Sequence, residues 1–346
     1  MKITREEILK LPKTDLHCHL DGSLRLKSII EMAKENKVEL ASFDEERLQQ
    51  LLLCGKKVDS LESYLKAFDL TLQVLQDKAS LARAAFELAE DAAQENVWHL
   101  EVRFAPVLHM QRGLRYAEIV DAVLLGLEKA QRQYKISTGL IICAMRHRPP
   151  SESKHVAEIC VAYKNKGVVG FDLAGAEADN PARHHQEAFS LVLSNNINCT
   201  IHAGEGYGPD SIAQAIHYCG THRIGHGTRL IEDGGLLNYV NDHRIPLEVC
   251  LTSNVQTNTV ASLDDHPFRF YFDYKLRVPL NTDNRLISNT TVTDELLLAA
   301  NQFNLTLDEI KDIIIYGFKS AFLPYHDKKK MLEDALRFMG RAIYPE

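Results

Sequence analysis

Paired cysteines, long apolar runs and an excess of positive charge are all missing from this sequence. The seven cysteines are odd in number and form no CxxC pair, which argues against a disulfide framework and a cysteine-based zinc site. No apolar run is long enough to span a membrane, and the charged start MKITREEILKL does not resemble a signal peptide. We therefore expect a soluble, cytoplasmic protein with reduced thiols in its core.

Basic residues are outnumbered, with 40 Lys and Arg against 47 Asp and Glu, which gives a net charge of −7. This balance argues against nucleic acid as a polymeric partner. No repeat, linker or low-complexity tract interrupts the 346 residues, of which 45% are hydrophobic. Residues 1–346 are therefore expected to form a single globular domain, with no membrane contact and no obligate protein partner indicated.

Short apolar runs alternate with longer amphipathic segments along the chain. The runs occupy residues 13–19, 98–104, 138–145, 168–174, 199–204, 222–226, 245–251 and 277–283. Segments between them, such as 80–96 and 117–134, have apolar residues at the three- and four-residue spacing of helices. This alternation is typical of parallel βα units, and eight of them predict an α/β fold closed into a (β/α)8 TIM barrel.

One connection is far longer than the others. Residues 20–97, between the first two runs, exceed the length of a simple crossover and contain several helical patterns, including SLESYLKAFDLTLQVLQ at 60–76. We expect this segment to form a helical lid inserted after the first strand. Near the other end of the chain, Thr306 and Glu309 form a capping-box pattern that predicts a helix over 306–322.

Polar side chains end several of the predicted strands. Because side chains alternate along a strand, His17 and His19 should point to the same face. His202, His226 and Asp283 end the fifth, sixth and eighth runs. Barrel active sites are built at these strand ends, and imidazole and carboxylate groups are suitable ligands for a catalytic zinc. The pattern therefore predicts a metal centre.

Simpler interpretations exist for each residue taken alone. A buried histidine satisfied by a hydrogen bond is commoner than a metal ligand. Asp21 could cap the following helix, Gly22 could form a turn and Gly175 could loosen a loop. Glu205, three residues after His202, could approach a substrate on the same rim. Four further histidines stay unassigned: His99, His109, His147 and His266.

The motifs TDLHCHLDGS, HLEVRFAP, GFDLAGAE, IHAGE, RIGHG and LNTDN together resemble those of adenosine deaminases in the metal-dependent amidohydrolase superfamily. HxH alone is shared across the superfamily, whereas HAGE followed by GHG and NTD is more specific to purine deaminases. The resemblance covers essentially the whole chain. It implies a TIM barrel that hydrolytically deaminates adenosine to inosine and ammonia in purine salvage, with 2′-deoxyadenosine as a further substrate.

The resemblance also implies roles for individual residues. One Zn²⁺ per chain would be held by His17, His19, His202 and Asp283. Glu205 would donate a proton to the purine ring, and His226 would orient and help activate the attacking hydroxide. Asp21 would contact the ribose, the backbone of Gly175 would contact the purine, and His19 would also border the nucleoside substrate.

Two features differ from related enzymes. Binuclear members of the superfamily carry a carboxylated lysine at the end of the fourth strand, but the run here ends FDLAGAE, so one metal is expected. Many adenosine deaminases have a second aspartate directly after the metal-binding one, whereas this chain has Asn284 after Asp283. Because adenine N7 accepts a hydrogen bond and an amide N–H donates one, we expect Asn284 to contact N7 directly.

Two alternative functions stay open at the level of sequence. Related enzymes deaminate free adenine or N6-methyl-AMP with the same metal centre, although no obvious Lys/Arg cluster for a 5′-phosphate is present here. A barrel that binds nucleosides without turning them over is a second class of function. The presence of every expected catalytic group argues against it.

Overall fold

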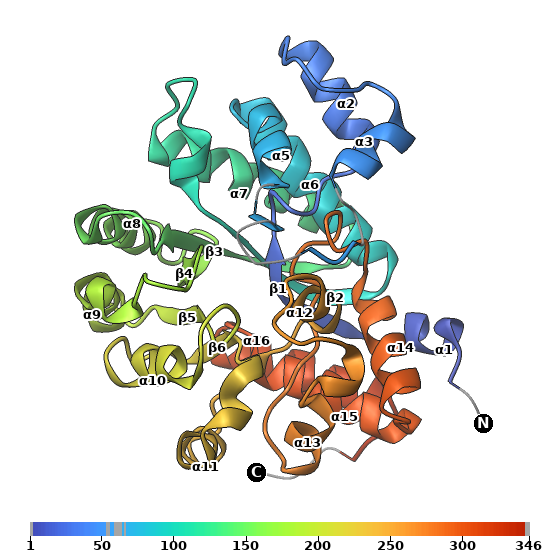
Figure 1. Ribbon diagram of the computed structural model, residues 1–346. Helices are drawn as coiled ribbons and strands as arrows, with labels where there is room; N and C mark the ends of the chain where they lie inside the picture. Colours follow the sequence, from blue (N-terminus) through green and yellow to red (C-terminus); the bar gives the residue numbers. More distant parts are fainter. Residues whose placement is uncertain (1–2, 53–55, 59–63, 66, 343–346) are drawn as a thin grey trace.

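The computed structural model describes residues 3–52, 56–58, 64–65 and 67–342, and the statements below concern these residues. Seven parallel strands follow one another in space in the same order as in the sequence (Figure 1). They are β1 (Lys13–His19), β2 (Val97–Phe104), β3 (Ser137–Met145), β4 (Val168–Ala174), β5 (Asn198–Ala203), β6 (Arg223–His226) and β7 (Leu247–Glu248).

The eighth predicted strand, residues 277–283, closes the ring with isolated bridges. Leu280 pairs in parallel with Val249 beside β7, and Asp283 pairs with Cys18 of β1. The segment is not a regular strand because Pro279 has no N–H to donate and Asp283 has φ +59°, outside the β region. The predicted (β/α)8 TIM barrel is confirmed, with its last strand reduced to these bridges.

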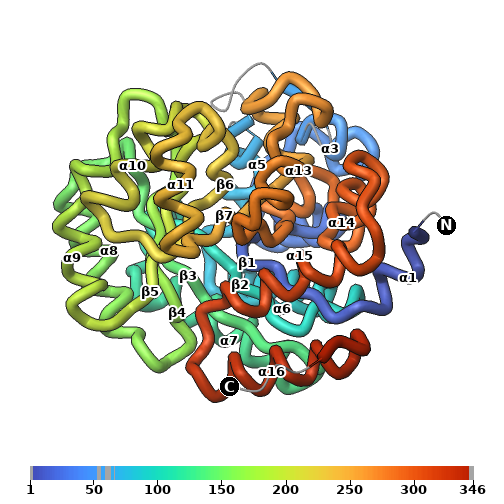
Figure 2. The backbone as a smooth tube through the Cα atoms, turned by 90° about the horizontal axis from the view of Figure 1, so that it is seen from below, coloured from blue at the N-terminus to red at the C-terminus, as the bar shows by residue number. Residues whose placement is uncertain are grey.

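Helices surround the strands on the outside of the barrel (Figure 2). The longer connections contain α7 (Tyr116–Gln133), α8 (Pro150–Ala162), α9 (Gln186–Ser194), α10 (Pro209–His217), α11 (Gly234–Asp242), α14 (Val292–Gln302) and α15 (Leu307–Ser320). Shorter or terminal helices are α1 (Arg5–Lys10), α12 (Leu251–Gln256), α13 (Phe268–Asp273) and α16 (Tyr325–Phe338). Helix α16 packs against α15.

Helix α15 shows how local sequence sets an element. Thr306 Oγ1 accepts a hydrogen bond from the Glu309 N–H (3.2 Å), and a Glu309 carboxylate oxygen accepts one from the Thr306 N–H (2.8 Å). This capping box satisfies two N–H groups that a helix start leaves unpaired. The predicted helix is thus confirmed. Its inner face packs into the core through Ile310, Ile313, Ile314 and Phe318.

The described residues between β1 and β2, where the long insertion was predicted, include four helices. They are α2 (Leu26–Glu35), α3 (Glu45–Leu51), α5 (Phe68–Val74) and α6 (Lys78–Gln94). Of the predicted helix at 60–76, residues 60–63 and 66 lie outside the described part of the chain. Tyr64 packs with Ala67 and Ile287, which joins this segment to the loop after the last barrel segment. The action of the insertion as a lid stays a prediction.

Six cysteines are described, and all six are buried free thiols, in agreement with the predicted reduced core. Cys54 lies outside the described residues. One continuous hydrophobic cluster runs between the strands and the surrounding helices. Within the described residues, no helix combines the length and the apolar character that crossing a bilayer requires.

Candidate active site

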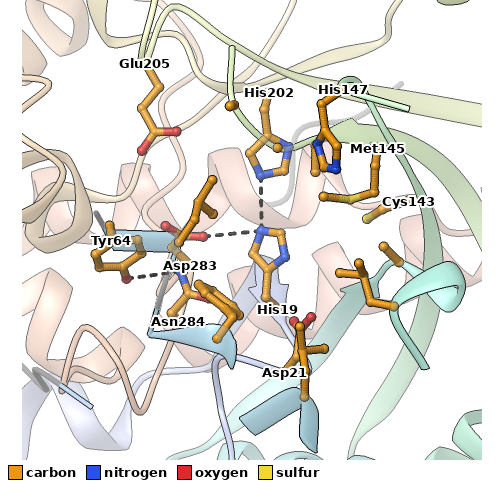
Figure 3. Close-up of a pocket in the computed structure, with 18 of the residues that line it drawn as sticks. His19, Asp21, Tyr64, Cys143, Met145, His147, His202, Glu205, Asp283 and Asn284 are labelled. Atoms are coloured by element: carbon orange, nitrogen blue, oxygen red, sulfur yellow. Dashed lines mark hydrogen bonds and ion pairs between the residues drawn. The ribbon is translucent and has the colours of Figure 1, made fainter. Parts of the chain in front are cut away.

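Residues from four distant parts of the chain meet at the carboxyl ends of the strands (Figure 3). His19 Nε2, at the end of β1, lies 3.1 Å from His202 Nε2 of β5 and 3.4 Å from Asp283 Oδ1. His17 Nε2 lies 3.4 Å from the same Asp283 oxygen. Donor atoms of His17, His202, His226 and Asp283 all lie within 4.8 Å of one another. The structure therefore brings all five residues together in one cluster.

The backbone around this cluster is unusual. His226 and Asp283 both have positive φ, +62° and +59°, although neither is a glycine. Such left-handed conformations cost free energy and are concentrated at functional sites. Gly225 precedes His226, and a Cβ at this position would lie 3.1 Å from His17 Cε1 and 3.2 Å from the His202 Cα. A residue without a side chain thus lets the histidines approach each other.

The donor set fits a divalent metal ion. His17 Nε2 is buried and has no hydrogen-bond partner, while its Nδ1 lies 2.9 Å from Glu248 Oε2. His202 Nδ1 lies 3.1 Å from a carboxylate oxygen of Asp172. A carboxylate that accepts a hydrogen bond from Nδ1–H leaves the Nε2 lone pair free for a metal. Imidazole nitrogens and a carboxylate are characteristic ligands of catalytic zinc.

The two carboxylates that contact His17 and His202 belong to a buried network of ion pairs. Arg103 donates to Asp172 (3.1 Å) and to Glu248 (2.8 Å), and all three side chains are fully buried. Arg223 lies 2.5 Å from the other Glu248 oxygen. Against the effect of burial, the two arginines hold the pKa of Glu248 well below its usual range. Glu248 therefore stays charged and keeps accepting from His17.

The sequence patterns alone do not predict this network. The available signal was the presence of charged residues inside apolar strands: Arg103 in HLEVRF, Asp172 in VVGFDLA and Glu248 in IPLEVCL. A charge in the interior of a barrel must be paired, because an isolated buried ion is very costly.

Glu205 lies on the loop that follows β5, and another carboxylate holds this loop in place. The four backbone N–H groups of residues 204–207 donate to Glu177 at distances of 2.6–3.1 Å. Glu205 Oε2 lies 3.5 Å from His226 Nε2. Burial raises the pKa of Glu205 well above its usual value, and the charges of Asp283 and Glu177 raise it further. Glu205 can therefore hold a proton that a substrate could take.

A cavity of about 350 Å³ opens above the cluster, a size that suits a small organic ligand. Its walls are formed mainly by apolar side chains of the insertion, of the loop after β2 and of the end of β3, including Leu65, Phe68, Leu72, Leu108 and Met145. Its polar groups come from His19, Asp21, Tyr64, His147, His202, Glu205, His226, Asp283 and Asn284, with the more exposed Asp69. No arginine or lysine is found among the described residues that line it.

Asp21 and Gly175 both line this cavity. Asp21 is buried, and its Oδ1 has no hydrogen-bond partner, so this oxygen is available to a ligand. Burial raises the pKa of Asp21 to about 7. Gly175 follows β4 with φ +101°, and a Cβ there would lie 3.2 Å from both His147 Nδ1 and Met145 Cε. A glycine thus leaves the backbone open to the cavity.

Asn284 also lines the cavity, and its amide nitrogen donates to the hydroxyl of Tyr64 (3.1 Å; Figure 3). A Cβ at Gly22 would lie 1.9 Å from Asn284 Oδ1. Gly22 therefore does more than form a turn, because any larger residue would displace Asn284. Tyr64 could not be assigned to the site from the sequence, because an aromatic residue in a helical pattern is ordinarily part of a helix core.

The matches with known proteins agree with this geometry. Residues 12–337 match the family model described as adenosine deaminase. The chain belongs to the adenosine deaminase family. It is 39% identical to an adenosine deaminase of Mycobacterium avium (strain 104), over 96% of both chains. It is 42% identical to a probable adenosine deaminase of Dictyostelium discoideum, over 93% of this chain but only 42% of the length of that protein.

Solved structures of other members of the fold superpose well. An adenine deaminase from Arthrobacter aurescens has a TM-score of 0.89 and 25% identity, covering 95% of this chain and 99% of its own. An Arabidopsis N6-mAMP deaminase has a TM-score of 0.86 and 27% identity, covering 97% of this chain and 99% of its own. Proteins with this fold thus include an adenine deaminase and an N6-mAMP deaminase.

Proposed function

We propose that this member of the family catalyses the zinc-dependent hydrolytic deamination of adenosine and 2′-deoxyadenosine to inosine and ammonia, as a cytoplasmic step of purine salvage. The observation that carries the proposal is the convergence of His17, His19, His202 and Asp283 beneath a cavity that also contains Glu205. These four residues would hold one Zn²⁺ per chain. Zinc, when bound, acidifies water and so supplies a nucleophile at neutral pH.

The protein's own groups would act on the purine. Glu205, with its raised pKa, would give its proton to N1 while oxygen adds to C6, so that no negative charge builds up on the ring. His226 would form a hydrogen bond with the attacking oxygen. Proton transfer to the amino group and loss of ammonia then restore the aromatic ring as inosine. Asn284 would donate to N7, and the backbone of Gly175 would border the purine.

The lining of the cavity favours a nucleoside over the two alternative substrates. The unpartnered Asp21 oxygen suits a sugar hydroxyl, which free adenine lacks. A 5′-phosphate would need positive charge, but the described lining residues include several carboxylates and neither arginine nor lysine. This lining therefore supports adenosine rather than N6-methyl-AMP.

The first prediction is a ranking of substrates. We expect kcat/KM to be highest for adenosine and 2′-deoxyadenosine, and lower by about tenfold or more for AMP and N6-methyl-AMP, because a phosphate buried without a partner loses its solvation. The measurement is the change in ultraviolet absorbance of the purine. A preference for adenine or for N6-methyl-AMP would replace the proposed substrate. The absence of turnover with every compound would support a binding module instead.

The second prediction concerns Asn284. Asn284→Leu is expected to lower kcat/KM for adenosine. The corresponding loss of transition-state stabilisation should be about 1–3 kcal/mol, the usual cost of leaving a buried polar group unsatisfied. The loss should be much smaller for 7-deazaadenosine, which has C–H in place of N7. The two substrates and two proteins form a double-mutant cycle. Tyr64→Phe serves as a control that removes the other partner of the amide. Equal losses for both substrates would contradict a contact with N7.

A further inference from the structure

A buried chain of hydrogen bonds leads from a backbone N–H to His226. It begins at Phe268, whose N–H lies 3.1 Å from Nδ1 of His266. Because a backbone N–H can only donate, this Nδ1 must accept. Burial lowers the pKa of His266 to about 3, so its ring is neutral and its single proton is on Nε2. The direction of the first bond is thus fixed.

The next member of the hydrogen-bond chain is Asn254, which lies between His266 and His226. His266 Nε2 lies 3.2 Å from Asn254 Oδ1, and Thr228 Oγ1 donates to the same oxygen at 3.0 Å. The N–H donor at His266 Nε2 identifies that atom of the amide as the oxygen, and the Thr228 hydroxyl is free to donate to it. The amide nitrogen then faces Nδ1 of His226, 3.1 Å away. Since an amide nitrogen can only donate, His226 Nδ1 must accept.

We propose that Asn254 is a positioning residue that holds His226 in the tautomer with its proton on Nε2, and so makes His226 a hydrogen-bond donor in the cavity rather than a metal ligand. The tautomer follows from the hydrogen bonds alone. The consequence, that Nε2–H faces the attacking oxygen, depends on the proposed function.

Distance alone does not separate His226 from the metal-ligand histidines, because its donor atom lies within 4.8 Å of those of His17 and His202. The partner of Nδ1 does separate them. His17 and His202 face the carboxylates of Glu248 and Asp172, at 2.9 and 3.1 Å, and a carboxylate can only accept. Their protons are therefore on Nδ1, and their Nε2 lone pairs are free for a metal. His226 has the opposite arrangement.

The test is a direct measurement of tautomers by NMR. In zinc-loaded protein labelled with ¹⁵N-histidine, long-range ¹H–¹⁵N correlations distinguish protonated from unprotonated ring nitrogens, and His226→Gln assigns the signals of His226. We expect His226 to be protonated on Nε2 and unprotonated on Nδ1. His17 and His202 should show the reverse and act as internal references. A proton on Nδ1 of His226, or on both nitrogens, would overturn the proposal, and this result requires no turnover.

A single substitution should reverse the donor and acceptor in the hydrogen bond between residue 254 and His226 Nδ1. Asn254→Asp keeps the shape of the side chain but places an acceptor opposite His226 Nδ1. The proton should move to Nδ1 and leave the Nε2 lone pair facing the metal ligands. We expect kcat for adenosine to fall by about 10²-fold or more, with a much smaller change in KM. Zinc transfer to a chelator should become about tenfold slower, because His226 can then bind the metal.

Asn258→Asp is the matched control, because it introduces the same charge at an exposed asparagine on the same segment. It should leave the His226 signals, kcat and zinc release unchanged. Asn254→Asp with unshifted His226 signals and unchanged kcat would show that Asn254 only packs the core. If the wild-type tautomer is as proposed and yet the protein deaminates no purine, the proposed function fails while the assignment of Asn254 holds.

Discussion

Glu205→Gln is expected to lower kcat for adenosine by about 10²- to 10⁴-fold while zinc stays bound, the range typical of a lost general acid or base. Glutamine keeps the shape and polarity of the side chain but has no proton to give to N1. The native carboxyl is suited to this task, because burial and the charges of Asp283 and Glu177 raise its pKa well above the ordinary value.

The measurement combines kcat with zinc content and thermal stability of the purified variant. Retention of zinc and of the melting temperature would separate a chemical role from damage to the loop that Glu177 holds. Glu187→Gln makes the same substitution at an exposed glutamate and serves as the control. A near-normal kcat in Glu205→Gln would mean that another group protonates N1.

Much of the barrel could be predicted because strand-forming runs are local features of the sequence. The first five predicted runs match β1 to β5 to within one or two residues at either end. The seventh, 245–251, shrinks to the two residues of β7 because Cys250 already forms the N-cap of α12. Apolar composition alone does not reveal where a buried strand turns into a buried helix.

The candidate site also contains residues that the sequence predicts and residues that it does not. Residues at strand ends, such as His202 and His226, could be proposed from motif and position, because the barrel gathers all strand ends on one face. Their hydrogen-bond partners could not. Asp172 and Asn254 lie on other elements, and nothing in the linear sequence states which histidine each will contact. Whether a histidine is a ligand or a hydrogen-bond donor is decided by those partners, so it emerges only from the structure.

Alanine at any of the four proposed metal ligands should remove zinc and activity together. The four substitutions are His17→Ala, His19→Ala, His202→Ala and Asp283→Ala. Each removes one of the four side chains that together would supply the protein ligands of the ion, and so leaves an incomplete coordination shell. Metal analysis of each purified variant, beside its kcat, gives the result. Full zinc with full activity in one variant would exclude that residue from the ligand set.

Removing a hydrogen bond to one proposed ligand should weaken zinc binding without abolishing it. Ser253 Oγ donates to Asp283 Oδ2 at 2.6 Å, which fixes the orientation of this carboxylate. Ser253→Ala removes that bond and leaves all four ligands in place, so zinc affinity should fall by about 10- to 100-fold, as is typical for a lost hydrogen bond to a ligand. Activity should then recover when excess zinc is added, whereas Asp283→Ala should not recover. Failure of added zinc to restore Ser253→Ala would indicate that Asp283 must also be aimed at the attacking oxygen, a role beyond holding the metal.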